Sequence, residues 1–252
     1  MSEVDLSGKK LMIAVPAYDG TVPVEWMLAF NYTVFLCQQY GVDLGITVRM
    51  NSSLIPKCRD EIVHNFLFDS DHDYLLCIDS DVVWHPEDVM HMLSKIDKFG
   101  TIGGVYCVKD EEPDFRVALM TAEGTPIESD GLLRAKAIPA GFMMIDRKTL
   151  MGLRENYENL NYNTDAEDVV KTEKVCALWS MVVGNGHYVG EDISFCMRLV
   201  ESGYRLWVDP EIELVHVGTK KYNHSYKEYL LKSMDEHEKA VAQDEPSIGL
   251  AS

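Results

Sequence analysis

Two carboxylates separated by one serine, Asp79 and Asp81, follow directly on the apolar run of residues 74–78. An apolar run of this length is typical of a buried strand, and open α/β sheets bind ligands beyond the carboxyl ends of their strands. Because residues two apart on an extended chain point the same way, we expect both carboxylates to face one hard cation. Carboxylate oxygens suit Mg²⁺ or Mn²⁺, with phosphate oxygens completing the shell. The alternative is a solvated acidic turn that begins the next helix.

A second pair of acids, Glu191 and Asp192, follows Gly190 where a helical pattern begins. An acid at a helix start is commonly an N-cap or a partner of the helix dipole, and the dipole would lower its pKa and weaken it as a base. That interpretation accounts for one acid well. The other hypothesis is that one acid deprotonates an acceptor group while the other holds substrate, with Gly190 allowing a sharp turn into the site.

An imidazole and two lysines near the end of the chain could complete such a site. His216 lies in the run 212–217, where strand alternation places it on one face with apolar neighbours. It is either a core histidine or a third metal ligand supplied from a distant strand. Lys220 and Lys221 follow, and they could neutralise a diphosphate or be ordinary solvated lysines.

Two segments that follow or precede predicted elements carry further candidates. Pro16, Ala17 and Tyr18 come at the end of the first apolar run, where the tyrosine could stack on a base or be a half-buried turn aromatic. The segment from Ser53 to Arg59 leads into a helix. The planar fork of Arg59 could reach a phosphate or a base, or it could form a surface ion pair with one of the two acids that follow it.

A small residue before a predicted strand offers a last candidate. Gly141 and Phe142 follow Pro139 and Ala140. A glycine at this position lets a ligand approach the backbone closely, although it could equally form a simple turn.

The composition narrows the class of protein. The chain has 252 residues, of which 46% are apolar, so it can bury a large core. Its net charge of −18 argues against broad binding to nucleic acid or to anionic membranes, because both need a basic face. The six cysteines form no C-x-x-C pair and are expected to be reduced core residues.

The sequence shows no signal peptide and no apolar run long enough for a membrane span. We therefore expect a cytoplasmic location, in a bacterium or in a phage-infected host cell.

Strands and helices alternate in the first part of the chain. We predict strands at 11–15, 44–50, 74–78 and 101–105, and helices at 23–40, 56–68 and 86–99. This alternation indicates an α/β fold with a parallel sheet and right-handed crossovers. Pro23 suits the first turn of its helix, and Gly41 suits a C-cap.

The pattern changes after residue 108. Shorter strands are predicted at 115–120, 132–138, 142–145, 205–208 and 213–217, and helices at 148–157, 193–202 and 225–242. Residues 159–187 are irregular and rich in Asn, Asp and Glu. A long loop in a compact domain is often a lid or a binding loop.

Taken in order, these motifs resemble the GT-A glycosyltransferases, particularly the family 2-like members of bacteria and phages, over about residues 10–222. Asp79-Ser80-Asp81 resembles the D-x-D motif, which binds a divalent metal and the diphosphate of a nucleotide sugar. Residues 15–18 resemble the segment that holds the nucleoside, and 53–59 resemble a Ser-Leu-x-x-x-x-Arg segment of phage-type members. Residues 190–198 are similar to the E-D-x-x-[FL]-C-x-R signature, and 203–216 to the G-Y-R…x-P…H ending.

The resemblance implies one GT-A domain over residues 1–252, with a Rossmann-like α/β fold. It has a mostly parallel central sheet and a small antiparallel sheet on the acceptor side. Residues from about 10 to 108 would form the nucleotide-sugar-binding half, about 109 to 222 the acceptor and catalytic half, and 223–252 a C-terminal helix and tail.

The resemblance also implies an activity: metal-dependent transfer of a sugar from a nucleotide-diphosphate sugar, with UDP sugars the commonest donors. Mn²⁺ or Mg²⁺ would lie on Asp79, Asp81 and His216. Asp192 would be the base of an inverting enzyme, with Glu191 positioning substrate. The expected donor-binding residues are Pro16, Ala17, Tyr18, Ser53, Arg59, Asp79, Ser80, Asp81, Gly141, Phe142, Lys220 and Lys221.

Several alternatives stay open. The acceptor could be a glycan, a lipid-linked glycan, a protein or a hydroxymethylated base in phage DNA, and inverting and retaining chemistry are not separated. An oligomer is also open. A nucleotidyltransferase would normally carry a basic, Gly-rich loop after the first strand, and residues 16–20 hold no Lys or Arg. A non-catalytic nucleotide- or glycan-binding subunit is the remaining alternative.

Overall fold

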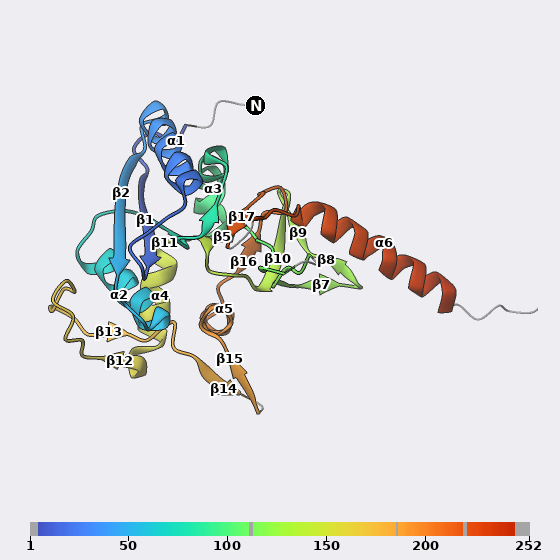
Figure 1. The fold of residues 1–252 in the computed structure, drawn as a ribbon. Helices are drawn as coiled ribbons and strands as arrows, with labels where there is room; N and C mark the ends of the chain where they lie inside the picture. The colour runs from blue at the N-terminus through green and yellow to red at the C-terminus, as the bar shows by residue number, and fades with distance from the viewer. Residues whose placement is uncertain (1–4, 111–112, 185, 219–220, 245–252) are drawn as a thin grey trace, which may run out of the picture.

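The computed structural model describes residues 5–110, 113–184, 186–218 and 221–244. Its centre is a nine-stranded sheet (Figure 1). The strand order is β2 (Asp43–Met50), β1 (Lys10–Ala17), β3 (Tyr74–Ile78), β11 (Phe142–Asp146), β5 (Thr101–Gly103), β16 (Leu206–Val208), β10 (Leu132–Ala137) and β6 (Ala118–Leu119), with β9 (Glu128–Ser129) also paired to β10. Strands β2, β1, β3, β5 and β16 run in one direction, so their carboxyl ends share one edge.

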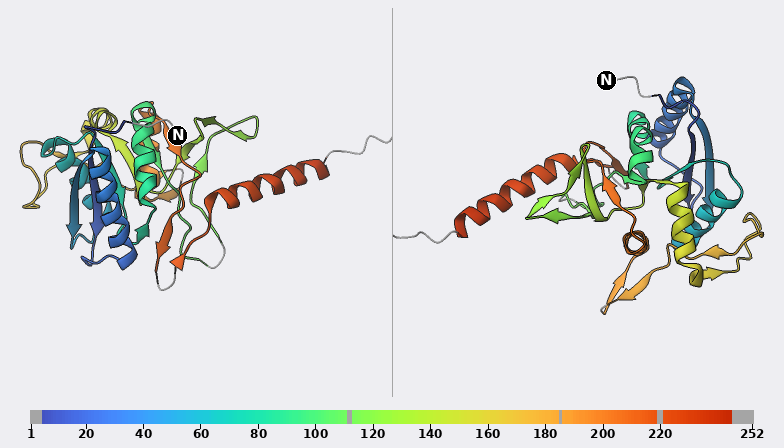
Figure 2. Two further views of the ribbon diagram at one scale, coloured as in Figure 1. Left: turned by 90° about the horizontal axis from the view of Figure 1, so that it is seen from above. Right: turned by 180° about the vertical axis from the view of Figure 1, so that it is seen from behind.

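Helices cover both faces of this sheet (Figures 1 and 2). One core cluster joins the sheet to α1 (Val24–Tyr40) and α3 (Pro86–Phe99). The other joins it to α2 (Ile55–Phe68), α4 (Arg147–Asn156) and α5 (Glu191–Glu201). Side chains of β1 alternate between the two clusters, as the period of a strand requires.

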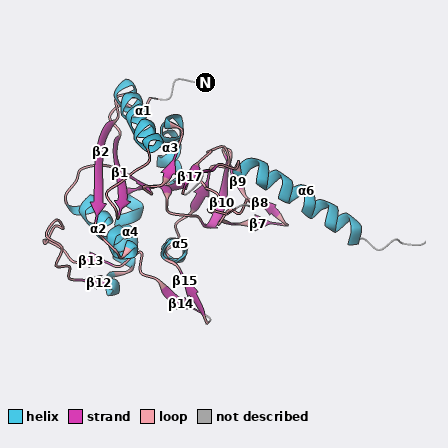
Figure 3. Cartoon of the chain, in the orientation of Figure 1, coloured by secondary structure: helices cyan, strands magenta, loops and turns pink. Residues whose placement is uncertain are grey.

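The remaining elements are short, apart from the last helix (Figure 3). A three-stranded sheet joins β4 (Val82–Val83), β17 (Val215–Val217) and β18 (Lys221–Tyr222). Two-stranded pairs are formed by β7 (Thr121–Ala122) with β8 (Thr125–Pro126), β12 (Asn161–Tyr162) with β13 (Val175–Cys176), and β14 (Val182–Gly184) with β15 (His187–Val189). A 3₁₀ turn, η1 (Glu158–Leu160), follows α4, and α6 (Tyr226–Asp244) extends away from the sheet (Figure 2).

Most predicted elements are confirmed, and β3 and α3 have the predicted bounds. Helix α1 ends at Gly41, whose φ of 68° is left-handed, and the six cysteines are buried and unpaired. Three predicted strands are shorter than expected by two residues or more: 101–105 is reduced to β5, 115–120 to β6, and 213–217 to β17. None of the helices in the described ranges is both long and apolar enough to cross a bilayer.

The position of strand β11 differs from the one we predicted. We expected residues 142–145 among the shorter strands of the second half, but β11 lies in the middle of the sheet, antiparallel to both β3 and β5. The side chains from Phe142 to Ile145 are all buried, because a central strand is covered on both faces. The turn at Gly141 that precedes β11 therefore lies beside the carboxyl end of β3, where Asp79 N–H donates to Gly141 O over 3.0 Å.

Helix α2 buries polar side chains because the stretch 161–180 packs over it. Asp60 Oδ1 accepts from the backbone N–H of Trp179 over 2.8 Å. Glu61 is paired with the buried Arg49, and it accepts from Thr164 Oγ1 over 2.6 Å. Part of the predicted loop is thus held by buried hydrogen bonds.

The environment of Asp60 makes the stability of this contact depend on pH. Burial raises the pKa of Asp60 to about 8, although hydrogen bonding to Trp179 and the charge of Arg198 oppose the rise. In an unfolded chain the pKa would be about 3.9. Between these values the folded protein holds a proton that the unfolded chain has lost, so this contribution to stability declines as pH rises from about 4 to 8.

We therefore predict that Asp60→Asn gains stability relative to the wild type as pH rises from 5 to 8. The amide cannot titrate, and one pKa unit corresponds to about 1.4 kcal/mol, or roughly 3–5 °C in Tm for a chain of this size. Thermal melts at the two pH values measure the difference. Asp69→Asn, at the exposed end of the same helix, is the control. Parallel melting curves for Asp60→Asn and wild type would contradict the prediction.

Candidate active site

The chain turns directly after β3, which changes how Asp79 and Asp81 lie. Val82 N–H donates to Asp79 O over 3.1 Å, so residues 79–82 form a turn that contains Ser80. Our expectation of an extended segment was therefore wrong, because two residues in a tight turn do not keep the alternation of a strand. The two carboxylates have different partners.

Asp79 is held by a buried arginine. Arg59 Nη2 lies 2.7 Å from Asp79 Oδ1, and the Arg59 side chain is only 4% exposed. Burial disfavours the guanidinium charge, but the carboxylates of Asp79 and Asp192 outweigh that effect and raise the pKa of Arg59. The guanidinium also lies over the ring of Trp179, 5.2 Å from its centroid. The ion pair considered from the sequence, with Asp60 or Glu61, is replaced by this buried one.

Asp81 lies beside His216, as the sequence hypothesis requires for a shared metal. His216 Nε2 is 3.5 Å from Asp81 Oδ2, and Lys109 Nζ also contacts this oxygen. Burial favours the neutral acid, but the bonds from His216 and Lys109 outweigh it and lower the pKa of Asp81 to about 2. The contact arises because β17 pairs with β4, which places His216 opposite Val82.

The other ring nitrogen of His216 fixes its orientation. His216 Nδ1 lies 2.9 Å from Cys107 O, so this nitrogen is the donor in the neutral ring. Nε2 faces Asp81, and its bond to that carboxylate needs a proton whose place a metal ion would take. This is the second-sphere arrangement that orients a histidine ligand toward a metal.

A divalent cation at this site would take some of its ligands from the protein and the rest from a substrate and water. Among the residues that the structure describes, no group of three or more His, Cys, Asp or Glu side chains could hold a metal ion. Asp81 and His216 form a pair, while Asp79 Oδ1 is taken by Arg59. Mg²⁺ is commonly bound by one or two carboxylates with phosphate oxygens and water. Asp81 and His216 could therefore supply the protein ligands.

Tyr106 occupies the middle of the site. A Cβ atom on Gly141 would lie 2.5 Å from Tyr106 Oη and 2.6 Å from Asp79 Oδ2, so both groups pack against the bare glycine. Burial and then the charges of Asp79 and Asp192 raise the pKa of Tyr106 well above its usual value. Its ring meets that of His216 edge-on at 4.8 Å. A neutral hydroxyl donor thus lies among the acids.

Asp192 is half-buried in the first turn of α5, which begins at Glu191. Asp192 Oδ2 accepts from the backbone N–H of Ala140 over 3.2 Å. Burial raises the pKa of Asp192 to about 6; Arg59 opposes the rise and the charge of Glu191 adds to it. Burial thus moves this pKa in the direction opposite to that of the helix dipole, which the sequence suggested would lower it.

Buried polar atoms without partners gather around Asp192 and Arg59. Within the described part of the chain, Arg59 Nε and Nη1, Asp192 Oδ1 and Trp179 Nε1 have no hydrogen-bond partner. Leaving such groups unpaired costs about 1–3 kcal/mol each. An arrangement of this kind is expected where a ligand or ordered water completes the bonds.

The other predicted residues lie at varying distances from these contacts. Pro16 and Ala17 are buried at the carboxyl end of β1, whereas Tyr18 and Ser53 are exposed. Phe142 is fully buried in the core, so its side chain is not placed to contact a bound donor as we expected. Lys220 lies outside the described residues, and Lys221 is described only as part of β18.

Two residues of the site, Tyr106 and Lys109, were missed from the sequence. Both follow β5, whose carboxyl end lies at the same edge as that of β3. This position was a signal that could have found them, because the same rule identified Asp79.

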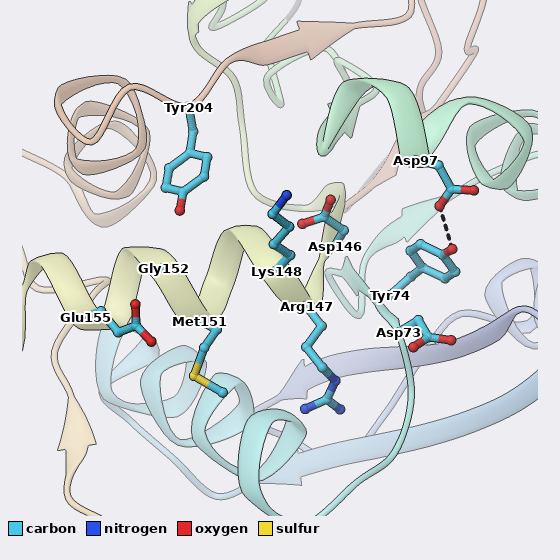
Figure 4. A pocket seen from close by; sticks show the side chains of 10 residues that line it. All are labelled: Asp73, Tyr74, Asp97, Asp146, Arg147, Lys148, Met151, Gly152, Glu155 and Tyr204. Carbon is cyan, nitrogen blue, oxygen red and sulfur yellow. Dashed lines mark hydrogen bonds between the residues drawn. The ribbon is translucent and has the colours of Figure 1, made fainter.

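A cavity of about 710 Å³ lies apart from this site, at the opposite edge of the sheet. It is lined by the start of β3, the end of α3 and the first turns of α4 (Figure 4). Several of its polar groups already have partners: Tyr74 Oη donates to Asp97 over 2.6 Å, and Arg147 donates to backbone carbonyls around residue 70. We therefore assign no chemistry to it.

Comparisons with known proteins bear on the fold alone. No protein-family model matches the chain, and no curated protein matches its sequence. The crystal structure of A197 from STIV matches with a TM-score of 0.53 and 16% identity, over 83% of this chain and 86% of that one. GalNAc-T7 with UDP, GalNAc and Mn²⁺ matches with a TM-score of 0.45 and 10% identity, over 83% and 44% of the two chains. TarS 1–349 of S. aureus matches with a TM-score of 0.42 and 13% identity, over 79% of this chain and 57% of that one.

The likeness to A197 shows that the two chains share a fold. The α/β fold class predicted from the sequence is confirmed, with a large, mostly parallel central sheet and small antiparallel sheets.

We predict that the Asp192 carboxyl titrates near pH 6 and that Glu191→Gln lowers its pKa, because the substitution removes a neighbouring negative charge. Carboxyl ¹³C NMR of Asp-labelled protein measures the titration, and loss of the signal in Asp192→Asn assigns it. Glu201→Gln, at the far end of the same helix, is the control and should leave the curve in place. An unchanged Asp192 titration curve in the Glu191→Gln variant would show that the charge of Glu191 does not raise this pKa.

Proposed function

We propose that the protein is a metal-dependent glycosyltransferase that moves a sugar from a nucleoside diphosphate, with UDP sugars favoured, to an acceptor hydroxyl with inversion. One observation carries the proposal. Two carboxylates at the same sheet edge have opposite surroundings: Asp81 is paired with His216 and Lys109, whereas Asp192 accepts one backbone N–H and has a buried oxygen without a partner, so the pKa of Asp81 is lowered to about 2 and that of Asp192 is raised to about 6. Environments that drive two such pKa values apart are typical of sites that divide ligation from proton transfer.

Asp192 is the proposed base. Its carboxylate would take the proton of the acceptor hydroxyl as the new bond to the sugar forms and the bond from sugar to diphosphate breaks. A pKa near 6 leaves the carboxyl ionised at neutral pH yet more basic than an ordinary aspartate. Glu191, beside it, would position the acceptor or the sugar.

Asp81 and His216 are the proposed protein ligands of Mn²⁺ or Mg²⁺, with Asp79 nearby. When bound, the cation would offset the charge that develops on the leaving diphosphate. Arg59 holds Asp79 in place. Lys220 and Lys221 remain candidates for phosphate binding, and Gly141 for close approach of the sugar.

The nucleoside would bind at the carboxyl ends of β1 and β2. Pro16 and Ala17 would form its floor, and Tyr18, which is 54% exposed, would stack on the base. Ser53 lies in the loop that follows β2. In this proposal residues of about 10–108 serve the donor, and those of about 109–222 serve the acceptor.

The surface beside Asp192 favours a glycan acceptor over modified DNA. Residues 175–197 contain no Lys or Arg, and nucleic-acid binding needs cations along the phosphate backbone. Large apolar side chains are exposed here instead, on the β14–β15 hairpin and the outer face of α5: Met181, Val183, Tyr188, Ile193, Met197 and Val200. An exposed aromatic such as Tyr188 suits the apolar face of a sugar ring.

We predict metal-dependent release of nucleotide from one donor in a panel of nucleotide sugars, with Mn²⁺ and not with EDTA. Asp192→Asn should lower the release rate by about 100-fold or more, because general-base catalysis contributes on that scale. Donor affinity, measured by calorimetry, should stay within about twofold of wild type. Glu201→Gln is the control. If Asp192→Asn released nucleotide at the wild-type rate, Asp192 would not be the base. If the wild-type protein released nucleotide from no donor, the result would argue for a binding subunit.

We predict that Asp81→Asn weakens Mn²⁺ binding by about tenfold or more, and that Lys109→Met strengthens it. The lysine occupies the Asp81 oxygen that the cation would need, so the two compete. Titration of Mn²⁺ by electron paramagnetic resonance, with UDP present, measures both effects. Lys148→Met removes a lysine at the opposite sheet edge and should change nothing. Unchanged affinity in both variants would mean that the metal, if any, lies elsewhere.

A further inference from the structure

Helix α1 carries apolar side chains on the face that points away from the core. Its buried side chains are Trp26, Ala29, Thr33 and Cys37. Its exposed ones include Val24, Leu28, Tyr32 and Phe35, and Tyr32 and Phe35 are 64% and 60% exposed. These four positions follow the spacing of a helical stripe, so they form one continuous ridge.

Strand β2, at the edge of the sheet, carries exposed apolar side chains as well. Ile46 and Val48 are 44% and 45% exposed. They pair in register with Ile13 and Val15 of β1, which pack in the core cluster on the α1 side. Parallel partners point to the same face of a sheet, so Ile46 and Val48 lie on the face that α1 covers only in part.

The ridge and the uncovered strand are neighbours. Phe30 stacks on Trp26, and Trp26 meets Trp84 just before α3, so this flank of α1 faces α3. Leu28 and Tyr32 are each two residues from Phe30, which places them on the opposite flank of the helix. Strand β2 lies on the other side of α1 from α3 (Figure 1), so its uncovered face borders the outer surface of α1.

The exposed apolar area is large enough to form a substantial part of a stable interface. The side chains concerned are about half exposed on average: Val22, Val24, Met27, Leu28, Tyr32, Phe35, Tyr40, Ile46 and Val48. At roughly 150–250 Å² for a free aromatic side chain, Tyr32, Phe35 and Tyr40 alone expose on the order of 300 Å², and the six aliphatic side chains add to this. Stable interfaces bury about 800 Å² per partner, and the largest apolar patch of a monomer is typically about 300–600 Å².

The charge pattern points to a second copy of this chain. The protein carries a net charge of −18, yet Glu25 is the only charged residue between Val24 and Tyr40. Two such acidic chains can approach closely where charges are few, and depletion of charge is typical of interface cores. The absence of Lys and Arg from α1 disfavours an anionic membrane as the partner.

We propose that the protein forms a two-fold dimer in which the α1 ridge of each copy packs on the uncovered β2 face of the other. A convex ridge and a flat strand side by side on one surface are self-complementary under a two-fold rotation, as an isologous interface requires. The dimer does not depend on the proposed chemistry, because Tyr32 and Phe35 have no place in the candidate active site.

Sedimentation equilibrium of the full chain tests this. Wild type should be a dimer at low micromolar concentration. Tyr32→Glu and Phe35→Glu should each raise the dimer Kd by at least about tenfold, because each places acidic groups in an apolar contact. Val183→Glu, on the exposed β14–β15 hairpin, is the matched control and should leave Kd unchanged. A monomeric wild type at 100 µM (about the upper range for weak dimers), or dimers that both variants leave intact, would overturn the proposal.

Cross-linking tests the geometry of the interface. The six natural cysteines are buried, so an introduced surface cysteine should react selectively with a short bismaleimide. A mixture of Tyr32→Cys and Val48→Cys proteins should cross-link more than either protein alone, because the proposed packing brings these positions together between copies. Equal yields in all three samples would show that the copies associate differently. Circular dichroism and thermal melts confirm that every variant is folded.

Discussion

The buried ion pair between Arg59 and Asp79 is the contact on which the candidate site depends. Arg59 belongs to α2 on one face of the sheet, and Asp79 follows β3 at its carboxyl edge, so a 2.7 Å bond joins the two layers at this edge. Removing one partner of a buried pair leaves an uncompensated charge, at a cost of about 3–5 kcal/mol. Trp179 covers the guanidinium, and the Asp192 carboxylate adds to its charge balance. One buried cation therefore constrains β3, α5 and the segment over α2 together.

The difference between the pKa values of Asp81 and Asp192 follows from this constraint. Both are partly shielded from water, which by itself favours the neutral acid. Asp81 has His216 and Lys109 against one oxygen, and their hydrogen bonds more than offset the shielding. Asp192 accepts a backbone N–H on one oxygen, and the nearby cation, Arg59, is paired with Asp79 instead. The same residue type thus becomes a strong acid in one place and a moderate base in the other.

The helices of this protein also differ in which of their faces are buried. The polar residues of α2 from Arg59 to Glu61 would suit a solvent face on their own, but the stretch 161–180 covers them and supplies their hydrogen bonds. Helix α1 shows the reverse, because its outer face is apolar and nothing in the described residues covers it. Such a face is costly in water, which is the physical reason for expecting a partner on it.

The sequence by itself determined the local elements and the order of the acidic motifs. Apolar periodicity and capping residues are local signals, so β3, α3 and the end of α1 at Gly41 could be predicted residue by residue. The same pattern placed Asp79, Asp81 and Asp192 at the ends of elements and His216 within a strand, and their proposed roles rest on that.

Only the tertiary structure decided which of these groups meet. The insertion of β11 between β3 and β5 brought Gly141 to Asp79, and the pairing of β17 with β4 brought His216 to Asp81. Tyr106 and Lys109 entered the site through the same long-range pairings. Such contacts join residues far apart in the chain, and the energy that selects them comes from burial and charge, which no local pattern records.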